Sequence, residues 1–425
     1  MSKVKIGDIT DSCLGKMLDA AKNKGEFAPY LANANVRWGT FDLSDLPEMR
    51  FEPHEQERYG LKYGDLVMCE GGEPVRCAIW KEEIPGMKIQ KALHRIRAHE
   101  GVDVRWLYYW FLACGQRHLL DRFFIETTIK HLPGERLKEI ELDLPSYEEQ
   151  KNVGEVLSIL DAKIDLNTRL CAELENMAKL IYDYWFVQFD FPDEHGKPYQ
   201  TSGGEMVWCK ELGRKVPKDW KVGTFHDLIK DIRTGLNPRQ NFTFSNGTIR
   251  YLTVKNLTLT GNIDYSGCDM IDDEARDIVH RRSDIRIGDV LFASIAPLGR
   301  CYLIQKEPRD WDINESVFSL RPNYDNCTSE YLYMTLKSDL FIMGSTNSST
   351  GSIFKGIRIN TLLDMPTLIP PHQILLQFTD CVGTWLRMQE NAFSESDELS
   401  HLRDWLLPML MNGQAKVEKA KEKMK

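Results

Sequence analysis

An internal repeat constrains this chain more than any other feature of its sequence. Residues 64–77 read GDLVMCEGGEPVRC and residues 288–301 read GDVLFASIAPLGRC, an offset of 224. Pro145 and Pro370 follow at an offset of 225, so the spacing hardly drifts along the match. Repeats of solenoid proteins are about 20 to 50 residues long, so this period indicates two whole globular units.

Composition fits an ordinary globular protein. Of the 425 residues, 42% are hydrophobic and 28% are charged, and no apolar run approaches the length of a membrane span, so we expect a cytoplasmic protein. The ten cysteines form no CxxC pair, which favours reduced, partly buried thiols over a metal site. The net charge is −9, but residues 146–220 alone carry 14 Asp and Glu against 9 Lys and Arg. Each repeat is therefore close to neutral, and a basic face on either remains open.

Each repeat predicts a mixed α/β (α+β) unit without regular βαβ alternation. In the first copy, GDLVMC and RCAIW predict two strands joined by a turn, and RWLYYWFLAC predicts a helix that GQRHLLDRFF continues. In the second copy, RIGDVLFASI and RCYLI predict the strands, and SEYLYMTLKSDLFIMG predicts the helix.

A long helix is predicted after each unit, at about 147–188 and 372–412. Steps of four and three residues give an apolar seam that matches between the two helices at an offset of 225. We predict an antiparallel coiled coil with the seam residues Leu160, Leu174, Ile181, Trp185, Trp385, Leu399, Leu406 and Leu410. The alternative is two helices within one compact domain. Asn167 on the seam either fixes the register or is an ordinary solvated side chain.

Catalytic motifs are absent from the sequence. It contains no phosphate-binding GxxxxGK[ST], no GxGxxG after a strand, no HExxH and no GxSxG. We therefore predict no catalytic residues and no metal site. Asp65 and Asp289 occupy matched Gly-Asp positions, which a paired-carboxylate site or a repeated turn would each explain; turn chemistry is the plainer interpretation.

The ordered set of segments resembles the specificity subunit of type I restriction–modification systems. The resemblance covers essentially the full chain and rests on the order unit, helix, unit, helix, with GD before a late strand in each unit. LPSYEEQ and IPPHQIL open the two helices, and DYWFVQFDF and LRDWLLPMLMNGQ close them. The second opening departs from the family pattern, because Gln373 is followed by Ile374 and Leu375 where the first has Glu148, Glu149 and Gln150.

The resemblance implies a non-catalytic subunit that recognises a bipartite site in double-stranded DNA. It implies target recognition domains at 1–146 and 206–370, a central helix with linker at 147–205, and a C-terminal helix with tail at 371–425. Two methyltransferase subunits and the restriction subunits are the implied protein partners. The resemblance gives this chain no cofactor and leaves S-adenosylmethionine, ATP and Mg to those partners.

Polar loops at matched positions supply the candidate DNA contacts, because base edges and phosphates are bound by Arg, Lys, Asn and His side chains. The candidates are Asn35, Arg37, Arg76, Lys130, His131, Lys255, Asn256, Arg300, Lys355 and Arg358. Each is otherwise an ordinary surface charge or a turn residue. Arg76 and Arg300 are weaker candidates, since residues that read different half-sites should differ between the repeats.

Two other function classes stay open. A stand-alone methyltransferase or restriction polypeptide would require the cofactor and catalytic motifs that the sequence lacks. A helical scaffold without a DNA role predicts no salt-dependent DNA binding even with partners present.

Overall fold

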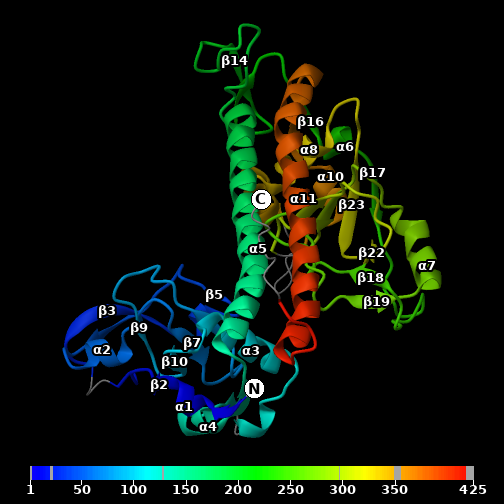
Figure 1. Ribbon diagram of the computed structural model, residues 1–425. Coiled ribbons are helices and arrows are strands. Elements are labelled where there is room, and N and C mark those ends of the chain that lie inside the picture. The colour runs from blue at the N-terminus through cyan, green and yellow to red at the C-terminus, as the bar shows by residue number, and fades with distance from the viewer. Residues whose placement is uncertain (1, 20–22, 127–128, 296, 349–355, 418–425) are drawn as a thin grey trace, which may run out of the picture. The chain divides into compact units, whose positions relative to one another are not determined.

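The computed structural model describes residues 2–19, 23–126, 129–295, 297–348 and 356–417 of a mixed α/β protein (Figure 1). Its internal contacts divide the chain into two compact units. Residues up to Ile164 and those from Asp397 onward form the first unit, and residues 165–396 form the second. The two predicted long helices are confirmed as α5 (Tyr147–Tyr182), which continues as a wide turn at Asp183–Val187, and α11 (His372–Met411).

A four-stranded antiparallel sheet forms the centre of the first unit. Its order is β2 (Thr10–Leu14), β10 (Leu93–Ala98), β7 (Leu66–Cys69) and β8 (Cys77–Ile79). Every residue of β7 is buried. Helix α3 (Val104–Gln116) packs against β8 and adds the fully buried rings of Trp106 and Phe111 to the core.

Shorter elements surround this sheet. Strand β3 (Glu26–Leu31) lies between β6 (Glu48–Phe51), which is antiparallel to it, and β9 (Lys88–Ile89), which is parallel. Strand β1 (Ser2–Lys5) pairs with β13 (Glu141–Leu144) just before α5. The remaining strands and α-helices are α1 (Ile6–Ile9), β4 (Val36–Arg37), β5 (Thr40–Phe41), α2 (Glu55–Tyr59), β11 (Ile125–Glu126), β12 (Lys130–His131) and α4 (Gly134–Glu139).

The second unit has a four-stranded antiparallel sheet with the equivalent strand order. Its strands are β17 (Ile229–Thr234), β23 (Val317–Pro322), β20 (Val290–Ala293) and β21 (Cys301–Leu303). Strand β18 (Ile249–Leu252) lies between antiparallel β19 (Asp269–Ile271) and parallel β22 (Trp311–Ile313). Strand β16 (Lys221–Thr224) pairs with β24 (Pro366–Ile369) just before α11.

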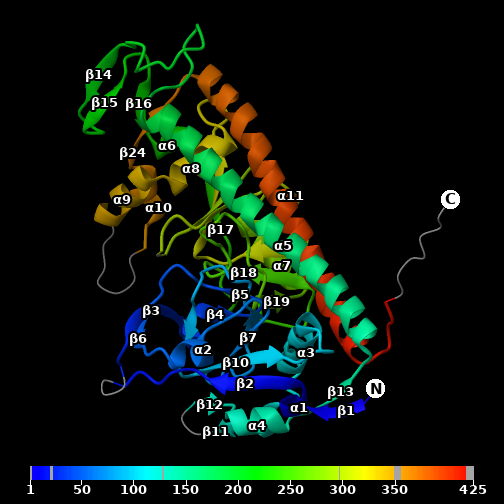
Figure 2. The same cartoon turned by 60° about the vertical axis from the view of Figure 1, so that its left-hand side comes forward.

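The short helices of the second unit are interspersed among its strands. They are α6 (Phe225–Leu228), α7 (Asp273–Ser283), α8 (Ser329–Lys337), α9 (Asp339–Ser348) and α10 (Ile359–Leu363). A hairpin of β14 (Met206–Cys209) and β15 (Arg214–Pro217) precedes the sheet (Figure 2).

The strand registers of the two units also match. Met68 pairs with Cys77 in the first unit, and Phe292 pairs with Cys301 in the second, at an offset of 224. The four predicted strands around these pairs are confirmed. The repeated Gly-Asp turn precedes each inner strand. Its glycine lies in the left-handed region, at φ 86° for Gly64 and φ 90° for Gly288, which explains why both copies need glycine there.

Two helix predictions are wrong in their extent. The helix predicted from RWLYYWFLAC is α3, but it ends at Gln116, because His118 takes a left-handed conformation with φ 55°. The helix predicted for the second copy is broken at Ser338 into α8 and α9. The Ser338 hydroxyl donates to Thr335 O at 2.7 Å and accepts from Phe341 N at 3.2 Å, so it ends one helix and caps the next.

Candidate nucleic-acid interface

Asp65 closes a turn and binds an arginine of the neighbouring strand. Its Oδ2 accepts from Lys62 N at 2.8 Å, and Arg97 Nε and Nη2 donate to its two oxygens, both at 2.7 Å. The carboxylate is buried, and a bidentate arginine is the partner that such a group needs. Asp65 therefore has a structural role in the turn.

Asp289 makes the same contacts in the second unit. Its Oδ2 accepts from Arg286 N at 3.0 Å, and Arg321 Nε and Nη2 donate to its two oxygens, both at 2.9 Å. Lys62 and Arg97 correspond to Arg286 and Arg321 at an offset of 224. The repeated Gly-Asp is thus a turn and an arginine clamp in each unit, as the turn interpretation predicts.

Arg76 and Arg300 each tie one loop to another within their own unit. Arg76 Nη2 donates to Asn33 O at 3.3 Å, and Arg300 Nη1 donates to Val254 O at 3.1 Å. Asn33 and Val254 are matched positions, at an offset of 221. Arg76 also donates to the Glu73 carboxylate at 2.8 Å. This geometry supports a role in the fold for the two identical arginines.

Asn35 and Asn256 are buried and brace matched turns. Asn35 Nδ2 donates to Asp42 O and Asp45 O, while its Oδ1 accepts from Ala32 N at 2.9 Å. In the second unit, Asn256 Nδ2 donates to Asp264 O at 2.8 Å, and its Oδ1 accepts from Thr253 N, also at 2.8 Å. Both amides are engaged with the backbone, so the geometry gives no support to base reading by these two candidates.

The remaining described candidates lie at the surface. Arg37 donates to the backbone of Ala34 and Val36, and Lys130 forms an ion pair with Glu126 at 3.0 Å. The other three are the half-buried His131 and the exposed Lys255 and Arg358. They occupy separate loops and short elements and form no single site. Lys355 lies outside the described residues. A DNA contact by any of these residues stays a prediction.

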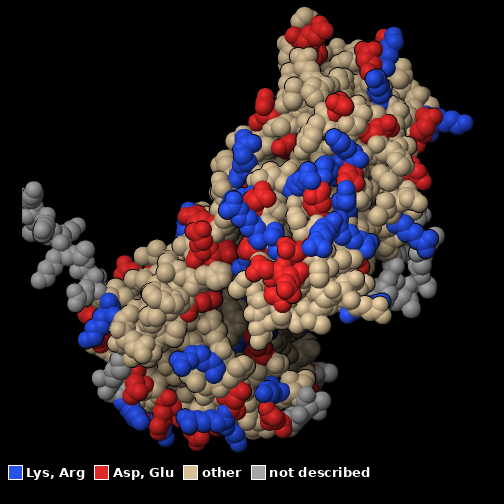
Figure 3. All heavy atoms as spheres, turned by 90° about the vertical axis from the view of Figure 1, so that its right-hand side faces the viewer, with Lys and Arg blue, Asp and Glu red and all other residues tan. Residues whose placement is uncertain are grey.

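Helix α7 carries basic residues that the sequence interpretation did not single out. Its last turn contains His280, Arg281 and Arg282, and the two arginines are exposed. Figure 3 shows the face of the second unit that carries α7, where Lys and Arg gather with Asp and Glu among them. The run of three consecutive basic residues in the sequence could have indicated this basic group. A helix C-terminus also favours cations by itself.

The predicted seam residues are all at least partly buried. Leu174, Trp185 and Leu410 are buried, and Leu160, Ile181, Trp385, Leu399 and Leu406 are half-buried. In the second unit, the Trp185 ring packs against Phe378 of α11, with centroids 6.0 Å apart. The burial agrees with helices that share an apolar face.

Polar contacts accompany the seam. Asn167 is buried, and its Nδ2 donates to Glu395 Oε2 at 2.8 Å, so it is not a solvated side chain. Gln389 Nε2 donates to Cys171 O at 3.2 Å. In the first unit, Arg403 Nη1 binds Asp161 at 2.8 Å. The hydrogen bond between the buried Asn167 and Glu395 can form in only one alignment of the two helices. A seam asparagine selects the helix register in this way.

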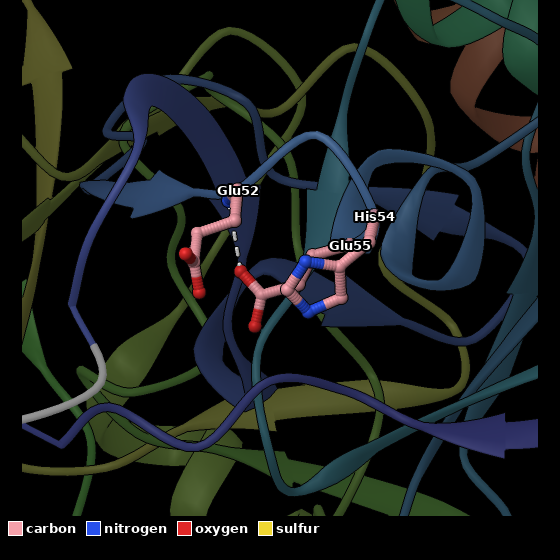
Figure 4. A group of neighbouring side chains, drawn as sticks. All are labelled: Glu52, His54 and Glu55. Carbon is pink, nitrogen blue, oxygen red and sulfur yellow. Dashed lines mark hydrogen bonds between the residues drawn. The ribbon is translucent and has the colours of Figure 1, made fainter.

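One group of possible metal ligands occurs among the described residues, at Glu52, His54 and Glu55 beside α2 (Figure 4). Glu55 Oε2 already accepts from Glu52 N at 2.9 Å and forms an ion pair with Lys16. Burial raises the pKa of Glu55, but these hydrogen bonds outweigh it and lower the pKa below its usual value. Because a lysine ammonium occupies the carboxylate, we assign this group to the fold.

Comparison with known proteins identifies a family that the sequence matches. Residues 1–176 match the family model described as the type I restriction modification DNA specificity domain. The resemblance predicted from the sequence is confirmed.

Individual relatives extend the similarity beyond this domain. The chain is 26% identical to the type I restriction enzyme MjaIX specificity subunit of Methanocaldococcus jannaschii, over 75% of this chain and 71% of that protein. It is 20% identical to the HindI specificity subunit of Haemophilus influenzae, over 68% and 72% of the two chains. The crystal structure of the type I restriction-modification S subunit from M. genitalium shares the fold, with a TM-score of 0.58, 14% identity and 96% coverage of both chains. Among the described helices, none has an apolar stretch sufficient to span a membrane.

Proposed function

We propose that this chain is the DNA sequence-specificity subunit of a type I restriction–modification system. The observation that carries the proposal is its similarity to specificity subunits over about three quarters of its length. Each α/β unit contributes a target recognition domain, at 1–146 and 206–370, that reads one half of a bipartite double-stranded DNA site. The chain itself has no catalytic activity and acts in the cytoplasm.

The matching strand orders of the two units support a tandem, pseudo-symmetric pair of readers. Their central sheets run β2-β10-β7-β8 and β17-β23-β20-β21, with the same antiparallel pairing. The segments 147–205 and 371–425 supply the spacer, as an antiparallel coiled coil. Half-sites one DNA turn apart are separated by about 34 Å, and the 36 residues of α5 reach about 54 Å at 1.5 Å per residue.

Methyltransferase subunits would dock on the helices. On α5 within the second unit, Leu166, Leu170, Met177 and Leu180 are exposed, at successive spacings of four, seven and three residues. Leu376 and Met388 of α11 are exposed as well. An apolar row of this kind on a helix pair is a surface for a protein partner, and restriction subunits join the same assembly.

Methylation mapping tests the proposal. Host DNA is sequenced for methylated adenine with and without this gene, in a strain whose methyltransferase partner is active. We expect one split motif, two short half-sites with an unspecified gap, to be methylated only when the gene is present. An identical methylation pattern in the two strains would count against a specificity subunit and leave the scaffold alternative.

A second experiment tests the spacer. One heptad inserted into α5 beside Asn167 and one into α11 beside Ala392 would keep the seam in register and lengthen it by about 10 Å. The gap in the motif should lengthen, or methylation should stop, while neither half-site changes its sequence. A changed half-site with an unchanged gap would mean that the helices are not a ruler.

A further inference from the structure

A hollow of about 450 Å³ lies beside α7 in the second unit. Its lining residues come from β17, from α7 and from the residue that ends this helix: Arg233, Asp277, His280, Arg281 and Asp284. None of the residues proposed from the sequence as a DNA contact lies in it.

A buried carboxylate holds one wall of the hollow in place. His280 Nδ1 lies 2.9 Å from Oδ2 of Asp312, a residue of β22 that is fully buried. This contact fixes the orientation of the imidazole ring. The other ring nitrogen, Nε2, has no partner among the described residues. A histidine oriented by a carboxylate is a preorganised donor when it is protonated.

Two arginines face the hollow with donors to spare. Arg281 is exposed and forms no ion pair or hydrogen bond with any residue that the structure describes. Arg233 uses Nε to bind Asp231 at 2.7 Å, which leaves its two terminal nitrogens. A guanidinium that faces solvent with unpaired donors fits a phosphate, because its fork matches the phosphate oxygens.

The hollow has two acidic lining residues, but only one of them has a carboxylate free to repel an anion. Asp284 is already bound by Arg286, at 2.9 Å, and by Arg321, at 3.3 Å. Asp277 is the one lining carboxylate without an ion pair among the described residues. The lining therefore offers three cationic donors, once His280 is protonated, against one free negative charge.

Within its described residues, the first unit has no counterpart of this arrangement. Asp312 corresponds to Lys88 at an offset of 224, in the matched strand β9. Helix α2 occupies the place of α7 in the element order, and its Glu55 is paired with Lys16. Where the surfaces of two otherwise matched units differ, the two units can bind their ligands through different contacts.

We propose that the hollow beside α7 binds a phosphodiester of the DNA backbone, with His280, Arg281 and Arg233 as donors. This inference rests on the proposed function and names a contact that the second recognition domain makes with its half-site. A phosphate fits better than a base edge, because the three converging groups are all donors and cationic. Phosphate contacts fix register and strengthen binding without reading sequence.

Binding at this site should depend on pH. The hydrogen bond that His280 donates to Asp312 raises the pKa of His280 above its usual value. Burial and the charge of Arg276 oppose this rise, and the charge of Asp284 adds to it. The other charged groups around the ring are Arg233 and Asp231 of β17 and Asp277 and Arg281 of α7. The protonated ring binds phosphate below this raised pKa, and affinity falls as the pH increases through it.

The test uses the full complex of this chain with its methyltransferase subunits and a DNA duplex carrying the mapped motif. Arg281→Gln should weaken binding by about tenfold and reduce the dependence of log affinity on log salt by about 0.9. Lys215→Gln, an exposed lysine of β15 that is not in the hollow, is the charge-matched control and should change neither. Asp277→Asn should act in the opposite direction and tighten binding, because it removes the free negative charge.

His280→Gln should remove the pH dependence between pH 6 and 8 while the methylated motif stays the same. Duplexes with single methylphosphonate groups in the second half-site identify the contact. One such position should weaken the wild-type complex but not the Arg281→Gln complex. If the wild type binds its motif and every variant matches it, the inference is wrong and the proposed function stands. If the wild type binds no motif at all, the proposed function fails first.

Discussion

The two units agree in their buried polar contacts and differ beside one helix. Asp65 with Arg97 and Asp289 with Arg321 form the same bidentate pair at an offset of 224. Strands β9 and β22 occupy matched places as well, yet one carries Lys88 where the other carries Asp312. The identical residues of these two clamps therefore maintain the fold, and we infer that residues that differ between the copies are the ones available for recognition.

The largest effect is expected on the helical seam, where matched positions are buried to different extents. Leu174→Asp places a charge at a side chain that is 6% exposed, and it should lower the free energy of unfolding by about 3 kcal/mol or more. Leu399→Asp, at the matched half-buried position, should cost less. Methylation should be lost at every site in the first variant, as measured by mapping methylated adenine and by thermal unfolding.

Ala172→Asp is the control for this pair, because Ala172 is exposed on the same helix. An equal loss of stability in all three variants would mean that the seam is not the buried face of α5.

The arginine clamps should contribute to the stability of both units. Asp65→Ala removes the carboxylate that binds Arg97 at two oxygens and should lower the free energy of unfolding by about 3 kcal/mol. The loss should be smaller for Asp289→Ala, since Arg321 keeps the Asp284 carboxylate as a second partner. Hydrogen exchange should localise each loss to its own unit. The exposed Asp325→Ala should be neutral, and a selective loss of DNA binding with stability intact would contradict a structural clamp.

Asn35 and Asn256 distinguish a turn residue from a base reader. Replacing either by Ala removes its hydrogen bonds to the backbone and should cost about 1–2 kcal/mol. The methylated motif should be unchanged in both variants. A changed half-site in either one would restore these residues as DNA contacts and break the rule drawn from the comparison.

The smallest effect concerns the pair of His280 and Asp312 in the second unit. Because Asp312 raises the pKa of His280 in the folded state, the stabilisation is fully present below the unfolded pKa of about 6.5 and is lost as the pH rises through the folded pKa. His280 is more than a third exposed, so the effect should be a few tenths of a kcal/mol. Unfolding of wild type and His280→Gln at pH 6 and pH 8 measures it, and a larger difference at pH 8 would contradict the assignment.

Local patterns in the sequence predicted local structure well. The hairpins around Cys77 and Cys301 and the helix α5 follow from alternation, turn residues and a seven-residue period, all of which act over a few residues. The break at Ser338 was missed because the apolar pattern continues through it, and only the hydrogen bonds of its hydroxyl separate α8 from α9.

Contacts between distant residues were harder to predict. The partners of Asp65 and Asp289 lie 32 residues further along the chain, and no local pattern marks them. Extending the repeat match to Arg97 and Arg321 would have identified these two arginines as the partners of Asp65 and Asp289. The hollow beside α7 joins residues of two elements, β17 and α7, and the sequence offered only the basic run after Val279 as a signal.

The hydrogen bond between Asn167 and Ala392 spans 225 residues. A ribosome adds about 5 to 20 residues each second, so roughly 10 to 45 seconds separate the synthesis of the two ends of this contact. During that interval the apolar stripe around Leu174 has been made and its partner helix has not. We therefore expect the yield of this protein in a cell to depend on whether a chaperone, or a subunit that binds α5, is present while the chain is being translated.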